Sequence, residues 1–205
     1  MKPRRNSPSK SPLDEQALYE IAVRALARKA RSIGELRQVL QKRQAAKEAI
    51  DAVIARLREH GYLDDARYAR TFVASRIEND RQGPRRVERD LAARRVHPDL
   101  IQKSIRAAYE EVDEHALLRD YLRRKVRLSK PPEKASAVAS LYRRLLRAGF
   151  SSATIVKKLQ GLLQSIPRRS SSRGSNAAID PEKWRAWVEA LSDLPEPEEE
   201  SEPRP

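Results

Sequence analysis

The sequence predicts an all-α fold built from three tandem three-helix repeats, each similar to a helix-turn-helix unit. Two observations carry this prediction. Glycine is scarce, at 6 of 205 residues, while Leu, Ala, Arg, Glu and Lys, which favour helices, dominate the chain. In addition, one pattern of apolar residues, with three, nine and three residues between its members, occurs three times along the chain.

The recurring apolar positions define two helices in each repeat. Residues four apart lie on one face of a helix, and the nine residues between the two pairs leave room for a turn. The copies are 51 and 54 residues apart, and their members are Leu36, Leu40, Ile50 and Ile54, then Val87, Leu91, Ile101 and Ile105, then Leu141, Leu145, Ile155 and Leu159.

The predicted turns agree in position but differ in chemistry. Gly149 suits the left-handed conformation that follows a helix, and Ser151 and Ser152 can cap the next helix. Pro98 in the second turn is suited to a first helical turn. The first turn, QKRQAAKEA, contains no helix-breaking residue, so we infer it from the other two.

A further helix is predicted before each pair, with sequences that start at Leu18, Arg67 and Leu117. Ser32 and Glu35 form a capping-box pattern that opens the next helix of the first repeat. Gly83-Pro84 stops one helix and starts another in the second. The predicted repeats therefore span residues 13–62, 63–111 and 112–166.

The two ends of the chain differ in composition from the repeats. Residues 1–12 are mostly Ser, Pro, Lys and Arg, and we expect them to be disordered. Residues 167–205 read as a linker, a short helix with Asp180 as cap and Pro181 at its first position, and an acidic tail. Trp184 and Trp187 give this helix an apolar face that could pack on the body or bind a partner.

Adjacent acidic residues open the first helix of every repeat. Asp14-Glu15, Asp64-Asp65 and Asp113-Glu114 are spaced by 50 and 49 residues. The first acid can cap free backbone amides, and the second favours the positive end of the helix dipole. Because the pair recurs with the repeat, we interpret it as structural, although Asp64 and Asp65 alone would also suit an acid- or metal-dependent nuclease.

The chain lacks the usual signatures of an enzyme. It has no cysteine, and His60, His97 and His115 have no partner at metal-ligand spacing. Phosphate-binding glycine loops and nucleophile elbows are also absent from the sequence. We therefore predict no catalytic, cofactor or metal site.

No apolar run approaches the roughly 18 residues that span a bilayer, and the basic N-terminal stretch is not followed by an apolar segment. These features indicate a soluble, cytoplasmic protein without a membrane role. Nothing in the periodicity requires a dimer, so we expect a monomer.

The strong positive charge lies in the repeats. The chain carries 43 Lys and Arg against 29 Asp and Glu, and residues 13–166 hold 33 of the bases and 20 of the acids. A body this basic favours a polyanionic partner such as nucleic acid. The clusters recur in successive repeats, and the candidate contact residues are Arg85, Arg86, Arg89, Arg94, Arg95, Arg123, Arg124, Lys125, Arg127, Arg143, Arg144, Arg147, Lys157 and Lys158.

The stretch GYLDDARYARTFVASR, followed by RRVERDLAARRV, resembles the signature of the RecX family of bacterial recombination regulators. The resemblance covers about residues 18–163, and the first turn departs from it because Gln44-Ala45 lacks the frequent glycine. Its most specific residues are Gly61, Tyr62, Leu63, Asp64, Asp65, Arg67, Tyr68, Ala69 and Phe72.

The resemblance implies an elongated, curved body of three repeats and a non-enzymatic role. RecX-like proteins bind the RecA recombinase and its filament on single-stranded DNA, limit filament extension or promote disassembly, and so modulate recombination, DNA repair and the SOS response. Double-stranded DNA is a further possible partner. The alternative is a stand-alone helix-turn-helix DNA-binding regulator, which would need base-reading side chains at the start of each third helix; AKEAIDAVIARL and SSATIVKKLQGL offer few.

Overall fold

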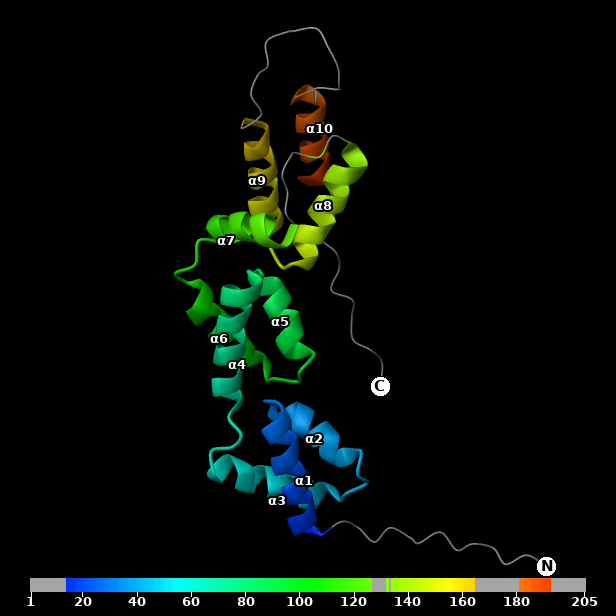
Figure 1. Cartoon of the computed structure of the whole chain (residues 1–205), viewed down its shortest axis with the longest axis vertical. Coiled ribbons are helices and arrows are strands. Elements are labelled where there is room, and N and C mark those ends of the chain that lie inside the picture. The colour runs from blue at the N-terminus through cyan, green and yellow to red at the C-terminus, as the bar shows by residue number, and fades with distance from the viewer. Residues whose placement is uncertain (1–13, 127–131, 133, 165–180, 193–205) are drawn as a thin grey trace, which may run out of the picture. The chain divides into compact units, whose positions relative to one another are not determined.

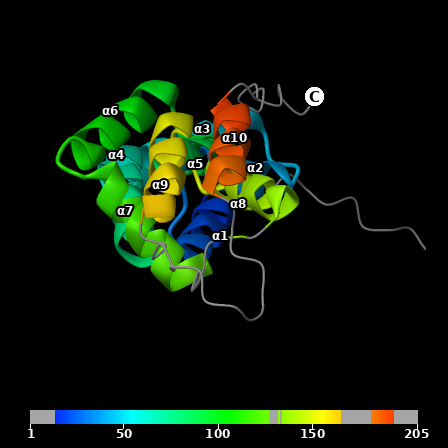
Figure 2. The same ribbon diagram turned by 90° about the horizontal axis from the view of Figure 1, so that it is seen from above.

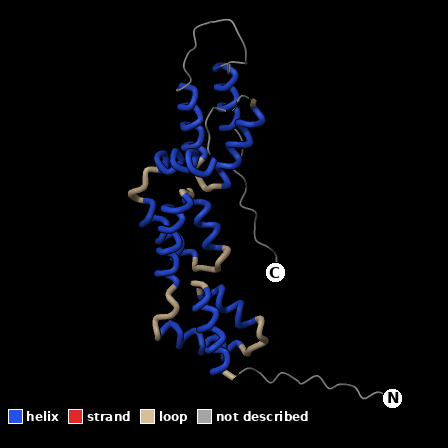
Figure 3. Tube along the Cα trace, viewed as in Figure 1, coloured by secondary structure: helices blue, strands red, loops and turns tan. Residues whose placement is uncertain are grey.

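The computed structural model describes residues 14–126, 132, 134–164 and 181–192 (Figure 1). These residues form ten α-helices and no β-strand, and helix and loop are coloured in Figure 3. Two of the helices continue into a π-helical segment. The elements are α1 (Glu15–Arg28), α2 (Ile33–Gln41), α3 (Lys47–Glu59), α4 (Asp65–Ser75), η1 (Arg76–Asp80), α5 (Pro84–Ala92), α6 (Pro98–Tyr109), α7 (Glu114–Tyr121), η2 (Leu122–Val126), α8 (Ala135–Arg147), α9 (Ser152–Gln164) and α10 (Pro181–Ser192).

This order confirms the predicted all-α fold of tandem three-helix repeats. Helices α1–α3, α4–α6 and α7–α9 follow the predicted succession, and α1, α4 and α7 each begin at the second acid of the predicted pair. The recurring apolar positions are buried, except for half-buried Ile105. Residues 1–13, which include the predicted N-terminal segment, and Asp180 lie outside the described residues.

Packing divides the chain into two compact units. The first unit lies within residues 1–73 and 89–107, and the second within residues 74–88 and 108–205. The first unit therefore contains α1, α2 and α3, and the second contains α7, α8, α9 and α10. Each unit also holds part of α4, α5 and α6.

The first unit has one apolar core, in which α1 packs against α2 and α3 and α2 packs against α3. Because each of these helices is short, its stability depends on burying its apolar face rather than on propensity alone. The buried core residues are Leu18, Ala22, Leu36, Leu40, Ile50, Val53, Ile54, Leu57 and Leu63.

The core of the second unit includes the tryptophan helix. Helix α10 packs against both α8 and α9 (Figure 2). The side chains of Trp184, Val188 and Leu191 are buried there, and the Trp184 indole Nε1 donates to the carbonyl oxygen of Leu159 at 3.3 Å. Of the two possibilities left open by the sequence, the structure therefore shows docking on the protein's own body.

All three helix-turn-helix turns contain a left-handed residue at the same position. Gln44 and Arg95 have φ of 58°, and Gly149 has φ of 93°. These residues lie four positions after Leu40, Leu91 and Leu145 of the repeated pattern. The first turn, which has no helix-breaking residue, thus adopts the same backbone conformation as the turn at Gly149. Gln44 carries a side chain in the left-handed region, which is unfavourable for residues other than glycine.

In the first unit, the turn between α5 and α6 docks on the start of α2. The hydroxyl of Ser32 donates to the carbonyl oxygen of Arg94. Gly34 allows the close approach, because a Cβ there would lie 2.7 Å from the carbonyl oxygen of Arg95. Ser32 also completes the predicted capping box with Glu35, through bonds of 3.0 and 3.2 Å.

In the second unit, the turn between α8 and α9 docks on the start of α5 in the same manner. The amide of Gly83 donates to the carbonyl oxygen of Ala148 at 2.9 Å, and the amide of Arg85 donates to that of Gly149 at 3.3 Å. By the periodicity, Gly83 corresponds to Ser32 and Ala148 to Arg94. The same type of joint is therefore built twice from different residues.

The start of helix α8 has no free group at the position where α2 and α5 bond a turn. The residue that corresponds to Ser32 and Gly83 is Ala137, which lies inside α8, and its amide donates to the carbonyl oxygen of Lys134 at 3.0 Å. Because α8 starts earlier than α2 and α5 in the repeat, Ala137 offers neither a hydroxyl like that of Ser32 nor a free amide like that of Gly83 to the carbonyl oxygen of a following turn.

Candidate functional site

The first acid of the pair caps its helix in two of the three repeats. The carboxylate of Asp64 accepts from the amide of Arg67 at 2.9 Å, and that of Asp113 accepts from the amide of His115 at 2.9 Å. Asp14 stands at the corresponding position without a side-chain cap bond. The hydrogen bond from the Arg67 amide holds the pKa of Asp64 below its ordinary value.

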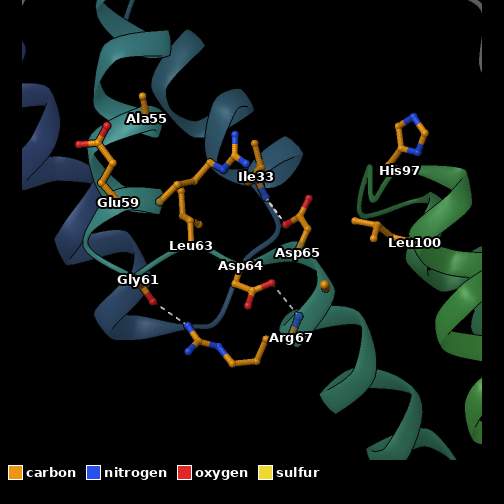
Figure 4. Close-up of a pocket in the computed structure, with 12 residues that line it drawn as sticks. Ile33, Ala55, Glu59, Gly61, Leu63, Asp64, Asp65, Arg67, His97 and Leu100 are labelled. Atoms are coloured by element: carbon orange, nitrogen blue, oxygen red, sulfur yellow. Dashed lines mark hydrogen bonds between the residues drawn. The ribbon is translucent and has the colours of Figure 1, made fainter.

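The second acid has a role that the periodicity does not reveal. The carboxylate of Asp65, at the start of α4, accepts from the amide of Ile33 at 2.8 Å and so caps α2 as well (Figure 4). Burial raises the pKa of Asp65, against the opposing effect of the Ile33 amide. In the second unit, the carboxylate of Glu114 likewise accepts from the amide of Ser151, at 2.8 Å.

A hollow of about 930 Å³ surrounds these carboxylates in the first unit (Figure 4). The Asp64 and Asp65 carboxylates are engaged with backbone amides of different helices. Among the described residues, no group of three or more His, Cys, Asp or Glu side chains is arranged to hold a metal ion. The hollow is lined by Ile33, Ala55, Arg58, Glu59, Gly61, Leu63, Asp64, Asp65, Ala66, Arg67, His97 and Leu100.

Two aromatic residues of the GYLDDARYARTF stretch, Tyr68 and Phe72, belong to the joint between α4, α2 and the α5–α6 turn. The rings of Tyr68 and Phe72 stack with centroids 6.2 Å apart. The guanidinium of Arg94 lies 4.6 Å from the centre of the Phe72 ring, and the Tyr68 hydroxyl donates to Glu35 at 3.5 Å. The stretch therefore connects the first and second repeats.

The beginning of the same stretch forms the turn from α3 into α4. Gly61 has φ of 71°, and its carbonyl oxygen accepts from the guanidinium of Arg67 at 2.7 Å (Figure 4). Leu63 is buried, whereas Tyr62 is 59% exposed. Gly61, Leu63 and Arg67 thus shape the turn, and Tyr62 faces solvent.

The first unit holds three of the predicted basic contact residues in different surroundings. Arg89 is exposed on α5. Arg94 is half-buried, and besides its stacking on Phe72 it donates to the carbonyl oxygen of Asp90 at 2.9 Å. Arg95 is exposed. With the Gln38 side-chain amide turned so that its oxygen faces Arg95, the Nε of Arg95 donates to that oxygen at 2.9 Å. Of the three, Arg94 has the least surface to offer a phosphate.

The second unit brings two of the predicted basic clusters together. The guanidinium of Arg144 on α8 donates to the carbonyl oxygen of Lys125 at the end of η2, at 2.9 Å. This bond fixes the basic part of α8 against the basic π-helical segment. We call the joined set the η2–α8 basic cluster; its members are Arg123, Arg124, Lys125, Arg143 and Arg144, all exposed.

Two aspartates that sequence reasoning missed partly neutralise this cluster. Asp80 lies 3.3 Å from the amine of Lys125, and Asp120 lies 3.0 Å from the guanidinium of Arg123. The hydrogen bond from Arg76 lowers the pKa of Asp80. Local spacing signals the pairs Arg76–Asp80 and Asp120–Arg123 in the sequence, whereas Asp80 and Lys125 are 45 residues apart. Within the described residues, Arg124 and Arg143 have no ion-pair partner.

The remaining basic candidates lie elsewhere. Arg85 and Arg86 stand in the first turn of α5, and Arg147 ends α8. Lys157 and Lys158 are neighbours on α9. Arg127 lies outside the described residues. The joined η2–α8 basic cluster is therefore the arrangement that the structure adds to the sequence prediction.

Comparisons with known proteins identify the family. Two family models match, RecX first three-helix domain at residues 19–57 and RecX second three-helix domain at residues 64–105. Regulatory protein RecX of Deinococcus radiodurans is 30% identical over 80% of this chain and 78% of its own length. This chain belongs to the RecX family. Regulatory protein RecX of Pseudomonas entomophila is 34% identical over 71% of this chain and 91% of its own.

The fold is also similar to solved RecX structures, and the share of each relative that aligns with this chain differs from one relative to another. The crystal structure of RecX from Lactobacillus salivarius superposes with a TM-score of 0.57 at 18% identity, covering 72% of this chain and 96% of that one, which supports the RecX fold. Alignments with two RecX proteins of Lactobacillus delbrueckii subsp. bulgaricus span 34% of those longer proteins. Within the described residues, no helix is long and apolar enough to cross a membrane.

Proposed function

We propose that this RecX family chain is a non-enzymatic cytoplasmic regulator that binds RecA and its filament on single-stranded DNA. It limits filament extension or promotes disassembly, and so modulates recombination and the response to DNA damage. Membership of a family of regulatory proteins supports this role, as do the basic clusters.

The η2–α8 basic cluster carries the proposal. Its arginines and lysine lie exposed on two adjoining elements of one unit, and Arg124 and Arg143 have no acidic partner among the described residues. Guanidinium groups bind phosphate oxygens bidentately, and cations clustered on one surface neutralise a phosphate backbone. We therefore assign this cluster to the DNA of the filament.

The surroundings of the third helices favour this reading over base recognition by a helix-turn-helix. The start of α9 is occupied by Glu114, which accepts from the amide and hydroxyl of Ser151 and from the hydroxyl of Thr154, at 2.6–3.0 Å. The first turn of α6 carries an acid, Asp99, which would repel phosphates. Neither helix offers a set of base-reading side chains at its start.

A RecA-driven ATP hydrolysis assay on single-stranded DNA tests the proposal. We expect substoichiometric protein to lower the hydrolysis rate and shorten filaments. Arg124→Glu/Arg143→Glu should weaken this effect about tenfold or more at low salt and reduce its salt dependence. The matched control is Lys42→Glu/Lys47→Glu, which reverses two exposed charges around the first turn.

Unchanged hydrolysis and filament length with the wild-type chain would refute the regulatory role. If the wild-type chain inhibits hydrolysis and Arg124→Glu/Arg143→Glu inhibits it equally, only the assignment of the cluster is refuted. Thermal melting of each variant confirms that the comparison is made between folded proteins.

A further inference from the structure

A second surface, on the first unit, differs in character from the basic cluster. It is a groove of about 430 Å³ between α1 with its following loop and the segment from Tyr62 to Thr71. The walls are mainly apolar, and the volume suits a side chain with its flanking backbone rather than a large cofactor. The lining residues are Val23, Leu26, Ala27, Ala30, Arg31, Tyr62, Asp64, Arg67, Tyr68 and Thr71.

Tyr62 stands at this groove with most of its ring in solvent. At 59% it is the large hydrophobic residue that stays exposed within the described part of the chain. Its ring contacts His60 edge to face, with centroids 6.2 Å apart, and His60 in turn is hydrogen-bonded to the Tyr19 hydroxyl at 3.0 Å. A tyrosine held in place yet exposed is typical of the residues that contribute most to protein interfaces.

Arg31 supplies an unpaired cation to the same groove. Its Nε is buried without a hydrogen-bond partner, and in the described residues its guanidinium forms no ion pair. Arg28 and Lys29, just before it, are exposed and also lack ion pairs there. Because the Nε is closed to solvent, a ligand in the groove would bond the terminal nitrogens of the Arg31 guanidinium, which are not buried.

The other charges that line the groove do not cancel Arg31. Asp64 is committed to the Arg67 amide as a helix cap, and the Arg67 guanidinium bonds the neutral carbonyl of Gly61. The lining therefore carries two cations and one anion, and Arg28 and Lys29 add positive charge beside it. This balance favours an anionic ligand.

We propose that this groove binds a short acidic segment of a partner protein. One aromatic or aliphatic side chain of the segment packs between Tyr62 and the apolar residues of α1, and a neighbouring carboxylate pairs with Arg31. Arginine binds carboxylates bidentately, and the apolar walls favour a peptide over a phosphate backbone. The inference goes beyond the proposed function, because it places protein recognition on a different surface from the DNA contact.

Fluorescence anisotropy with labelled peptides, in the absence of RecA and DNA, tests this site separately from the proposed function. The probes are Ser-Gly-Glu-Asp-Phe-Glu-Asp-Gly-Ser and its counterpart with Leu in place of Phe. Control peptides replace either the apolar residue or the acids with Ser. We expect saturable binding of the two probes and about tenfold weaker binding of both controls.

Variants of the chain locate the binding. Arg31→Gln and Tyr62→Ser should each weaken it about tenfold, whereas Lys42→Gln, at an exposed site on the first turn, should leave it unchanged. Tyr62→Ser changes an exposed residue and should melt as the wild-type chain does, so the test survives if Arg31→Gln fails to fold.

Four results would overturn the proposal. The first is no saturable binding of either acidic probe, and the second is binding that both variants retain. The third is tighter binding of oligothymidylate than of the peptides, together with loss of that oligothymidylate binding in Arg31→Gln; this result would make the groove a nucleic-acid site. Tighter peptide binding by a chain shortened to Ser192 would assign the groove to this protein's own acidic tail and overturn the partner assignment.

Discussion

The two joints between repeats reach the same geometry by different chemistry. In the first unit the joint depends on side chains, because the Ser32 hydroxyl meets the Arg94 carbonyl and Arg95 is forced into a left-handed conformation. In the second unit the backbone alone makes the contact, through Gly83 and Gly149. An added Cβ should therefore destabilise both joints, and more strongly the second, where the neighbours are backbone atoms.

The largest effect is expected from adding a methyl group to the second joint. A Cβ at Gly149 would collide with the backbone nitrogen of Arg86 and lie 2.6 Å from the Gly83 carbonyl oxygen, at a φ that disfavours alanine. Gly149→Ala should lower the unfolding free energy by ~3 kcal/mol in denaturant titrations. Gly161→Ala is the matched control, because nothing lies within 4 Å of its added Cβ and alanine favours the helix. Equal effects at both glycines would contradict the close contact.

A smaller effect is expected at the first joint, where the neighbour is partly a side chain. Gly34→Ala should cost about 2 kcal/mol, because its Cβ would meet both the Cβ and the carbonyl oxygen of Arg95. In an Arg95→Gly background the same change should cost ~1 kcal/mol less. A double-mutant cycle by thermal or chemical denaturation measures this coupling, and strict additivity would show that the two residues do not touch.

The carboxylates of the first joint should respond to pH in opposite ways. Asp65→Ala leaves the Ile33 amide without its acceptor and should cost ~1–2 kcal/mol, whereas Asp65→Asn keeps an acceptor oxygen and should cost little at neutral pH. Because burial raises the folded-state pKa of Asp65, the wild type should gain stability relative to Asp65→Asn as the pH falls through that pKa.

Asp64 gives the matched control for this pH response. Its folded-state pKa is lowered, so its contribution is present above the unfolded pKa and is lost as the pH falls through the folded one. Melting curves between neutral and acidic pH should therefore show the wild type losing its advantage over Asp64→Asn. The same sign of pH dependence at both positions would contradict the assigned surroundings.

The smallest effect is expected from the ion pairs of the second unit. Asp120→Asn removes the partner of Arg123 at 3.0 Å and of Arg81 at 3.7 Å, but both contacts lie near the surface. The loss should be below ~1 kcal/mol and should disappear in high salt. A large, salt-independent loss would show that these ion pairs contribute more to stability than surface pairs usually do.

Local features of the fold were predictable because they are encoded in neighbouring residues. The Ser32–Glu35 capping box, the helix start at Pro98 and the left-handed Gly149 are all found where their residue types indicate. The sequence pattern also predicted the cap at Asp64. Each of these depends on contacts within a few positions of the chain, which residue chemistry specifies directly.

The missed features join residues that are distant in the sequence. Nothing in the spacing pairs Asp65 with Ile33 or Arg144 with Lys125, because those contacts follow from how helices pack and not from their own periodicity. The left-handed Gln44 was also hidden, since its residue type disfavours that conformation and only the shared turn geometry requires it.

The early start of α8 affects whether a further repeat could dock on the third one. The turn of one repeat hydrogen-bonds the first residue before the second helix of the preceding repeat, as Arg94 does at Ser32 and Ala148 at Gly83. The corresponding residue of the third repeat, Ala137, lies inside α8 and its amide is already hydrogen-bonded to Lys134. Helix α10, packed on α8 and α9, covers the same terminal repeat. We therefore expect that a copy of the repeat appended after α9 would lack the hydrogen bond by which the start of α2 and the start of α5 each hold the turn of the following repeat.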